Sequence, residues 1–147
     1  MGATNFDEYR DVFVVADTID DVVHPVTYEL IGQARRIAKE LGQLVQVMLL
    51  GENVQAEAEE LVAHGADIVH VFESPLLRYY TTDGYTKVLT DFFEDHKPNI
   101  LLIGATNNGR DLAPRMSGRM QNGVVADCTI LTVDTEEGLV EWTRPAL

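Results

Sequence analysis

The sequence predicts an α/β fold: a Rossmann-like, doubly wound, mostly parallel sheet with helices on both faces and an antiparallel edge at its C-terminal end. Two observations lead to this prediction. Short continuous apolar runs rich in β-branched residues, typical of strands covered on both faces, alternate with stretches of 3.6-residue apolar periodicity, typical of helices. Strands and helices that alternate at this length form βαβ units, and such units build a parallel sheet with right-handed crossovers.

The first half of the chain is divided by turn and cap residues. The predicted strands lie at 12–16, 44–50 and 68–72. A helix opens at His24–Pro25, carries apolar residues at helical spacing, and ends at Gly42. A shorter helix is predicted over 54–64, with Val62 turned toward the core beside Ala58 and Leu61.

The second half continues the alternation. Residues 73–80, which include Tyr79–Tyr80, are predicted to form an irregular loop over the sheet edge. Thr82 or Asp83 is expected to cap the next helix, which ends before Pro98.

The last elements complete the sheet. A helix is predicted from about 110 to 120, with Pro114 in its first turn, where proline is tolerated. The remaining strands are predicted at 100–103, 124–133 and 139–142, the last two forming a pair around a turn at 136–138. No internal repeat or low-complexity linker interrupts the chain, so a single α/β domain is expected over 1–147.

Composition limits the classes of partner. The formal net charge of −13 disfavours nucleic acid and anionic membranes as partners. The apolar runs are too short to cross a bilayer, and the N-terminus has no secretory signal. Cys128 is the single cysteine, which excludes an internal disulfide framework and fits a reducing compartment. A cytoplasmic protein without membrane insertion is therefore expected.

The segment from Gly104 to Arg115 is the most informative one. It follows a buried strand and enters a helix, so it lies at the carboxyl edge of the sheet, where ligands and partner surfaces gather. Gly104 and Gly109 have the spacing of a P-loop, but Arg110 and Asp111 stand where that loop needs Lys and then Ser or Thr. Hydrolysis of a nucleoside triphosphate is therefore disfavoured.

Other catalytic or cofactor motifs are missing from the sequence. The turn at 16–21, after the first strand, has no glycine and three carboxylates, so it lacks the dinucleotide fingerprint. The four histidines have no metal-ligand spacing to one another or to Cys128, and are interpreted as cap, surface or edge residues. Cys128 itself is read as a buried thiol in a strand. No catalytic residue and no metal site is predicted.

Three arginines reverse the local sign of the charge around the 104–115 segment. Arg110, Arg115 and Arg119 lie close together in an otherwise acidic chain. One interpretation is that they meet an anion or an acidic partner. The other is that Arg115 forms a surface ion pair with Asp111, one helical turn earlier.

Two stretches point to a known family. They read GATNNGRDLAPR at 104–115 and ADCT at 126–129, and they resemble the N-terminal domain of the electron-transfer flavoprotein alpha subunit. Further similar stretches lie at 14–17, 28–32, 65–67, 80–88 and 143–146. The stretch at 80–88 is most similar to forms from anaerobic bacteria.

The resemblance implies an electron carrier rather than an independent enzyme. It implies a heterodimer of alpha and beta subunits that accepts electrons from acyl-CoA dehydrogenases, as in fatty acid beta-oxidation, or from NADH, and passes them to a redox acceptor. FAD would be held mainly by a second domain that begins after Leu147, outside this chain. The present domain would act as a scaffold, contact the beta subunit and hold no cofactor alone.

The resemblance also indicates site residues. Those of the motif itself, Thr106, Asn107, Asn108, Gly109 and Arg110, would face the cleft between the subunits, where the beta subunit holds AMP or a second flavin. Asn107 and Asn108 would present side-chain donors in a turn, and Gly109 would permit close backbone approach. Arg110 would meet an anionic group of a ligand or a carboxylate of the beta subunit.

One alternative of another class remains open. A free-standing adenine-nucleotide-binding module of the same broad fold, akin to a universal stress protein, would also fit the order of elements. It would need a glycine-rich phosphate loop followed by Ser or Thr, which this sequence lacks. Binding of ATP, AMP or FAD to the isolated chain would distinguish the two.

Overall fold

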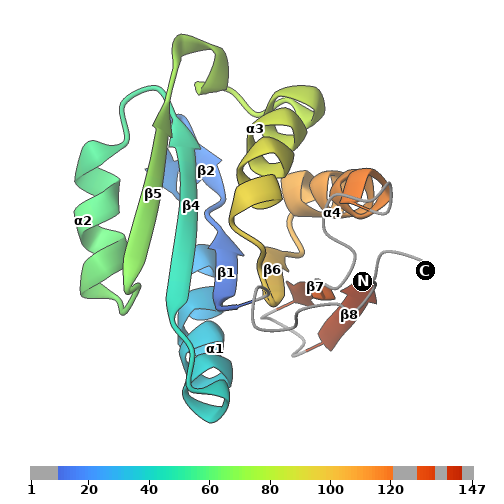
Figure 1. The fold of residues 1–147 in the computed structure, drawn as a ribbon. Helices are drawn as coiled ribbons and strands as arrows, with labels where there is room; N and C mark the ends of the chain where they lie inside the picture. Colours follow the sequence, from blue (N-terminus) through green and yellow to red (C-terminus); the bar gives the residue numbers. More distant parts are fainter. Residues whose placement is uncertain (1–9, 121–128, 135–138, 144–147) are drawn as a thin grey trace.

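The computed structural model describes residues 10–120, 129–134 and 139–143, and their core is one twisted sheet (Figure 1). Its strands are β1 (Val12–Val15), β4 (Val45–Gly51), β5 (Ile68–Glu73), β6 (Ile100–Gly104), β7 (Thr129–Asp134) and β8 (Leu139–Thr143). The helices are α1 (Pro25–Leu41), α2 (Gln55–Ala63), α3 (Thr82–Asp95) and α4 (Asn107–Met120), with a 3₁₀ turn η2 at Pro75–Leu77. Two short strands, β2 (Thr18–Ile19) and β3 (Val22–Val23), form a separate hairpin.

The strand order confirms the predicted doubly wound sheet. The order is β5-β4-β1-β6-β7-β8, and every neighbouring pair is parallel except β7 with β8, which is antiparallel. The antiparallel C-terminal edge is therefore confirmed as well. The chain winds outward from β1 through β4 to β5, then crosses to β6 on the other side of β1. The direction of winding thus reverses between β1 and β6.

Helices cover both faces of the sheet, as predicted (Figure 1). Successive residues of β1 point to opposite faces, because side chains alternate along a strand. Val12 and Val14 pack in the core under α1 and α2, whereas Phe13 and Val15 pack in the core under α3 and α4. All four are buried, which explains why β1 reads as a continuous apolar run.

The predicted ends of α1 are confirmed, but the prediction that Val62 of α2 is buried is wrong. The His24 Nδ1 atom accepts the amide N–H of Val26, and Gly42 ends α1 at a positive φ of 67°. Val62 of α2 is 53% exposed, although the periodicity placed it in the core. It lies beside the edge strand β5, where no further element of the described chain covers it, and Leu61 takes the buried position.

The hairpin β2–β3 was not predicted from the sequence. Asp20 and Asp21 form its turn with positive φ angles of 51° and 63°, the pair of left-handed residues that a type I′ turn requires. Aspartate tolerates this conformation better than most residues. Two of the three carboxylates after β1 therefore belong to a structural turn at the carboxyl edge.

Two predicted helix starts need correction. Helix α3 is capped by Thr81, whose hydroxyl accepts the amide N–H of Gly84, and neither Thr82 nor Asp83 is the cap. Helix α4 begins at Asn107, about three residues before the predicted start, so Pro114 lies inside it and not in its first turn. The proline has no N–H to donate to the carbonyl four residues earlier.

Some predictions fall outside the described residues. The start of the strand predicted at 124–133 and the buried thiol of Cys128 lie there.

In the described part of the chain, no helix has both the length and the apolar character needed to cross a membrane. Those same residues contain no group of three or more His, Cys, Asp or Glu arranged to hold a metal ion.

Candidate functional site

The winding reversal between β1 and β6 places a small pocket at the carboxyl edge of the sheet, the usual position of ligand sites in this class of fold. It is lined by the ends of both strands, by α4 and by two tyrosines: Val15, Ala16, Asp17, Thr18, Tyr80, Tyr85, Ile103, Gly104, Asn108, Gly109 and Leu112. Its volume is about 20 Å³, which is room for about one water molecule. A nucleotide does not fit in this arrangement.

The chain's own side chains fill the floor of this pocket. The Tyr85 hydroxyl lies 3.1 Å from the Thr18 hydroxyl and 3.3 Å from the carbonyl oxygen of Leu50, to which it donates. Tyr85 is only 4% exposed, and burial raises the pKa of its phenol. This neutral, bonded tyrosine occupies space that a ligand would need at the strand ends.

Packing explains the spacing of the two glycines in the 104–115 motif. A Cβ atom on Gly109 would lie 1.8 Å from the carbonyl oxygen of Gly104, and one on Gly104 would lie 3.3 Å from the side chain of Val26. The first helical turn of α4 therefore rests directly on the end of β6. The P-loop-like spacing reflects this close helix–strand contact.

Thr106 connects α4 to the end of β1. Its hydroxyl oxygen accepts the amide N–H of Gly109 at 3.1 Å, and its carbonyl accepts the amide N–H of Arg110 at 2.8 Å. The same hydroxyl donates to the Asp17 carboxylate at 2.5 Å. This capping contact explains why α4 begins at Asn107.

Most of the predicted site residues therefore lie in a helix, and not in the loop that the sequence predicted. Asn107, Asn108, Gly109 and Arg110 form the first turn of α4, where Asn107 and Arg110 are exposed and Gly109 is buried. Asn108 lines the pocket, and the Arg110 Nε atom donates to the carbonyl of Ala105 at 3.2 Å. The five residues lie together at one corner of the carboxyl edge.

The expected ion pair between Arg115 and Asp111 is wrong. Arg115 instead pairs with Asp83 of α3, with Nη2 2.6 Å from Oδ1. The reason is that the Asp111 carboxylate accepts hydrogen bonds from the hydroxyls of Thr82 and Tyr80. These bonds, that of Thr82 above all, lower the pKa of Asp111.

Tyr80 closes the pocket on the side of the 73–81 loop. It is half-buried, packs edge-on against Tyr85 and donates its hydroxyl to Asp111 at 2.8 Å. Burial and the neighbouring Asp111 carboxylate raise the pKa of Tyr80 to about 12. Of the two tyrosines in the loop over the sheet edge, Tyr80 therefore packs against the core, whereas Tyr79 is 64% exposed.

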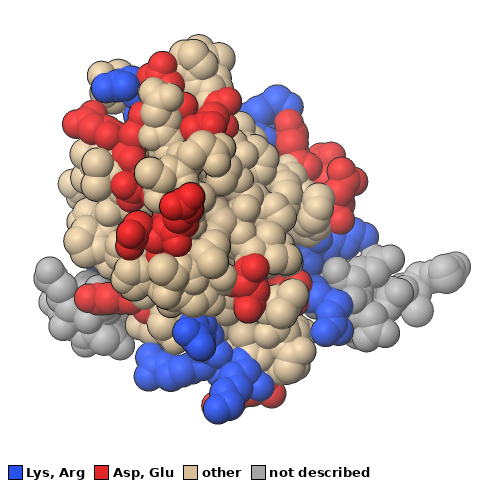
Figure 2. Space-filling model, turned by 90° about the vertical axis from the view of Figure 1, so that its left-hand side faces the viewer, with Lys and Arg blue, Asp and Glu red and all other residues tan. Residues whose placement is uncertain are grey.

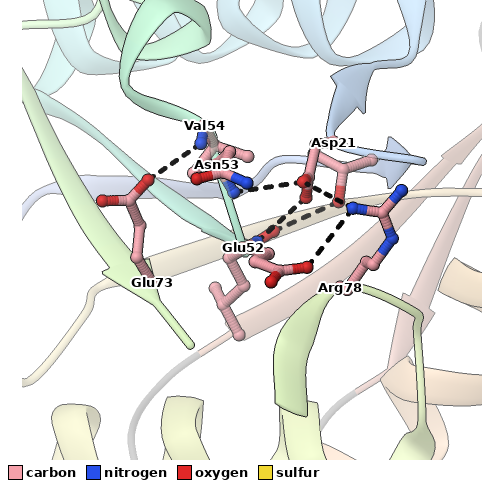
Figure 3. A network of polar contacts seen from close by, with 8 residues as sticks. Asp21, Glu52, Asn53, Val54, Glu73 and Arg78 are labelled. Atoms are coloured by element: carbon pink, nitrogen blue, oxygen red, sulfur yellow. Dashed lines mark hydrogen bonds and ion pairs between the residues drawn. The ribbon is translucent and has the colours of Figure 1, made fainter. Parts of the chain in front are cut away.

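Sequence reasoning missed a polar network that fixes the hairpin turn (Figure 3). The two carboxylate oxygens of Asp21 accept the amide N–H groups of Glu52 and Asn53, at 2.9 and 3.1 Å. The Arg78 guanidinium lies 3.3 Å from the Glu52 carboxylate and 3.9 Å from that of Asp21. The paired aspartates between two β-branched dipeptides, TI-DD-VV, were the available signal for this hairpin.

A second carboxylate holds the start of α2 in the same region. Glu73, at the end of β5, accepts the amide N–H of Val54 at 2.9 Å (Figure 3). It also accepts the side-chain amide of Gln55 at 3.0 Å. These two bonds, that of Gln55 first, lower the pKa of Glu73. The carboxyl edge therefore carries a negative charge that persists at neutral pH.

The histidines lie where the sequence predicted, at caps, surfaces and an edge. His24 caps the start of α1, while His64 and His96 follow the ends of α2 and α3 and are exposed. His70 lies on the edge strand β5 and bonds to Gln46 at 2.6 Å. Burial lowers the pKa of His70, with a smaller effect of His96 in the same direction.

Charge is distributed unevenly between the two ends of the sheet. Figure 2 shows acidic side chains over the upper part of one face and basic side chains gathered at its lower end. At that amino edge, Arg35, Arg36 and Lys39 of α1 line an open groove. Acidic side chains thus dominate the hairpin side of the carboxyl edge, where Arg78 is paired, and a basic cluster lies at the amino edge.

Comparison with known proteins agrees with the resemblance found in the 104–115 motif. The family model described as "Electron transfer flavoprotein domain" matches residues 12–147, nearly the whole chain. The chain belongs to this family. The predicted resemblance to alpha subunits from anaerobic bacteria is thereby confirmed.

Among relatives of this electron transfer flavoprotein domain, the alpha subunit of Megasphaera elsdenii is 46% identical over 140 residues, covering 95% of this chain and 41% of that protein. A protein of Acetobacterium woodii named lactate dehydrogenase (NAD(+),ferredoxin) subunit LctC is 45% identical, covering 94% and 33%. The alpha subunit of Thermoanaerobacterium thermosaccharolyticum is 42% identical, covering 95% and 42%. The chain thus spans about two-fifths or less of the length of these relatives.

Proposed function

We propose that this chain is the scaffold and beta-subunit-binding part of a heterodimeric electron-transfer flavoprotein. The complete protein would carry electrons from acyl-CoA dehydrogenase-type or NADH donors to a redox acceptor, without catalysing a reaction of its own on a substrate. The observation that carries the proposal is the 46% identity to an alpha subunit along 95% of the chain. The names of two other relatives mention NAD(+) with ferredoxin and an acryloyl-CoA reductase, which supports a redox role linked to NAD or to acyl-CoA compounds.

FAD is proposed to be held in the parent heterodimer by parts other than the described residues. The pocket between β1 and β6 has a volume of about 20 Å³ and is filled by Tyr85 and Thr18, so the residues present do not fit a flavin. The alternative of a free-standing nucleotide-binding module is disfavoured for two reasons. The pocket is too small for a nucleotide, and its lining includes the Asp17 carboxylate, which would repel a phosphate. The chain would therefore contribute contacts and rigidity to electron transfer.

The contacts with the beta subunit are proposed to involve Thr106, Asn107, Asn108, Gly109 and Arg110. Thr106 caps α4 and connects it to β1, and Gly109 seats α4 on β6, so these two residues would position the turn. Asn107 and Arg110 are exposed and would make the contacts themselves. The guanidinium would meet a carboxylate of the beta subunit or an anionic group held by it.

Replacing Arg110 by Ala tests this assignment in the full-length heterodimer. The affinity of the alpha chain for the beta subunit is expected to fall about tenfold, because an interfacial carboxylate loses its partner. Titration of the alpha chain with the beta subunit measures the affinity, and the rate of acceptor reduction measures electron transfer. Arg119→Ala, at the exposed opposite end of the same helix, is the matched control and should leave both unchanged. Unchanged affinity and rate in Arg110→Ala would refute the role of this residue.

A further inference from the structure

A groove at the amino edge of the sheet concentrates positive charge on an acidic protein. It lies between the C-terminal half of α1 and the α2–β5 turn, and its volume is about 760 Å³. Its charged lining residues are Arg35, Arg36, Lys39 and Asp67, and it is called here the amino-edge groove. Figure 2 shows the basic side chains gathered at this end of the molecule.

The three cations of the groove have no carboxylate partner among the described residues. Three other basic residues of that part of the chain form ion pairs with Asp or Glu. Arg35, Arg36 and Lys39 are exposed and form none, although the chain carries 24 acidic residues against 11 basic ones. Because Arg35 and Lys39 stand one helical turn apart, their like charges destabilise α1. An anion bound between them would remove this repulsion.

The helix macrodipole explains only one of these three charges. Cations stabilise the C-terminal end of a helix, but the effect is confined to about the last turn. Lys39 is the basic residue in the last turn of α1. Arg36 and Arg35 lie five and six residues before Leu41, the last residue of the helix. Their position therefore needs another explanation.

Arg35 is held across the groove by a glycine of the opposite wall. A Cβ atom on Gly65, in the α2–β5 turn, would lie 2.5 Å from both Cδ and Nη1 of Arg35. Gly65 also has a φ of 118°, which residues with a side chain rarely adopt. The guanidinium thus lies against the backbone of the turn. A side chain placed in this way loses less entropy when it binds a ligand.

The side-chain acceptors of the groove are already bonded within the protein. The Asp67 carboxylate accepts the amide N–H of Val45 at 2.9 Å. The side-chain oxygen of Gln43 accepts the amide N–H of Asp11 at 2.8 Å and the side-chain amide of Asn99 at 3.2 Å. Three cations against one carboxylate leave the lining with a net charge of +2. The groove therefore offers donors and positive charge, which suit an anionic ligand with several oxygen atoms.

Size and surroundings favour a small anion over an acidic protein. A volume of about 760 Å³ lies within the usual range of small-molecule sites. A protein partner would cover about 800 Å² of this chain, and its contact would extend over α2. Glu59 and Glu60 are exposed there, in the same helix as Val62 of the groove lining, and would repel an acidic partner. A small anion would contact the groove alone.

We propose that the amino-edge groove is a binding site for a small phosphate-bearing anion, with a diphosphate group as the part that is recognised. Arg35 and Arg36 would donate to phosphate oxygens, since the planar guanidinium matches a phosphate with two parallel hydrogen bonds. Lys39 would add a third positive charge. The site lies at the opposite edge of the sheet from the pocket between β1 and β6, and it does not depend on the proposed function.

The test is a calorimetric titration of the full-length protein with inorganic pyrophosphate at low salt. The wild type is expected to bind with a Kd below about 1 mM. The double variant Arg36→Gln with Lys39→Gln should bind at least about tenfold more weakly, because two of the three attracting charges are removed. Both side chains are exposed, so the melting temperature should stay close to that of the wild type.

Two single variants separate a built site from a general effect of charge. Arg119→Gln, exposed near the end of α4, removes a positive charge outside the groove and should bind pyrophosphate as the wild type does. Arg35→Lys keeps the charge but loses the planar fork, and its affinity should fall about threefold. Titration with ADP distinguishes the source of the phosphate. Tighter binding of ADP than of pyrophosphate, lost in the double variant, assigns an organic diphosphate; otherwise the ligand is the inorganic anion.

Three results would overturn the proposal. The first is a wild-type protein that does not bind pyrophosphate or ADP. The second is equal binding by the wild type and the double variant, which would place the anion elsewhere in the protein. The third is binding of a polyglutamate peptide, but not of pyrophosphate, that the double variant loses. In that case the groove would instead recognise an acidic protein segment. None of these results bears on the proposed electron-transfer function.

Discussion

Replacing Gly109 by Ala is expected to lower the free energy of unfolding by about 3 kcal/mol, at the upper end of the usual range for overpacking. The added methyl group would lie 1.8 Å from the carbonyl oxygen of Gly104 and 3.1 Å from the side chain of Ile103. Backbone atoms cannot yield as a flexible side chain can, so α4 must move away from β6. Thermal unfolding should show a melting temperature lower by about 6–12 °C.

Gly118→Ala is the matched control in the same helix. A Cβ atom at Gly118 would meet nothing within 4 Å, and alanine is favoured over glycine in a helix by about 1 kcal/mol. Gly118→Ala should therefore leave the melting temperature unchanged or raise it slightly. Equal melting temperatures for Gly109→Ala and the wild type would show that α4 does not rest on β6 as described.

Replacing Phe93 by Ala is expected to destabilise the domain by about 3–5 kcal/mol, the usual range for removal of a buried aromatic ring. Phe93 of α3 is fully buried and packs edge-on against Phe13 of β1, with ring centroids 5.4 Å apart, and against Phe92, 5.6 Å apart. Its removal leaves a cavity between α3 and the centre of the sheet. Urea unfolding followed by circular dichroism measures the loss.

Two companion variants distinguish lost packing from a general effect of substitution. Phe93→Leu keeps most of the buried volume and should cost clearly less than Phe93→Ala. Leu76→Ala removes an apolar side chain that is 85% exposed and should change stability by no more than about 0.5 kcal/mol. A Phe93→Ala protein as stable as Leu76→Ala would contradict the assigned core.

The main elements could be predicted because their signals are local. Strand β1 is buried on both faces, so all of its residues are apolar, and α1 begins and ends at His24 and Gly42 because these residues satisfy its terminal groups. The resemblance to the family was visible in the sequence because the wording of the 104–115 stretch is specific to it. Packing explains part of that wording, since Gly109 lies against the backbone of Gly104 and Thr106 bonds to Asp17.

The predictions that were wrong concern features that depend on contacts between residues far apart in the sequence. The early start of α4 follows from Thr106, whose capping hydroxyl is positioned by Asp17, 89 residues earlier in the chain. The pairing of Arg115 with Asp83 follows from the hydroxyls of α3 and its preceding loop that engage Asp111. Helical spacing alone could indicate only the neighbour one turn away.

The hairpin shows why part of the carboxyl edge could not be predicted from hydrophobic periodicity. Its strands have two residues each, too few for an alternating pattern to stand out, and its turn uses Asp20 and Asp21 where glycine or asparagine is the stronger signal. Arg78, which anchors it, lies 57 residues further along in a loop. Only the folded arrangement brings these residues to the carboxyl edge.

Hydrogen exchange of the full-length alpha chain, with and without the beta subunit, tests most directly whether the carboxyl edge of this domain is the subunit contact. Peptides covering 104–112, which contain the proposed contact residues, should exchange more slowly in the complex. Peptides covering the C-terminal end of α1, at the basic amino edge, should be unaffected. Protection confined to the amino edge, or no change in the peptides covering 104–112, would contradict the proposed contact.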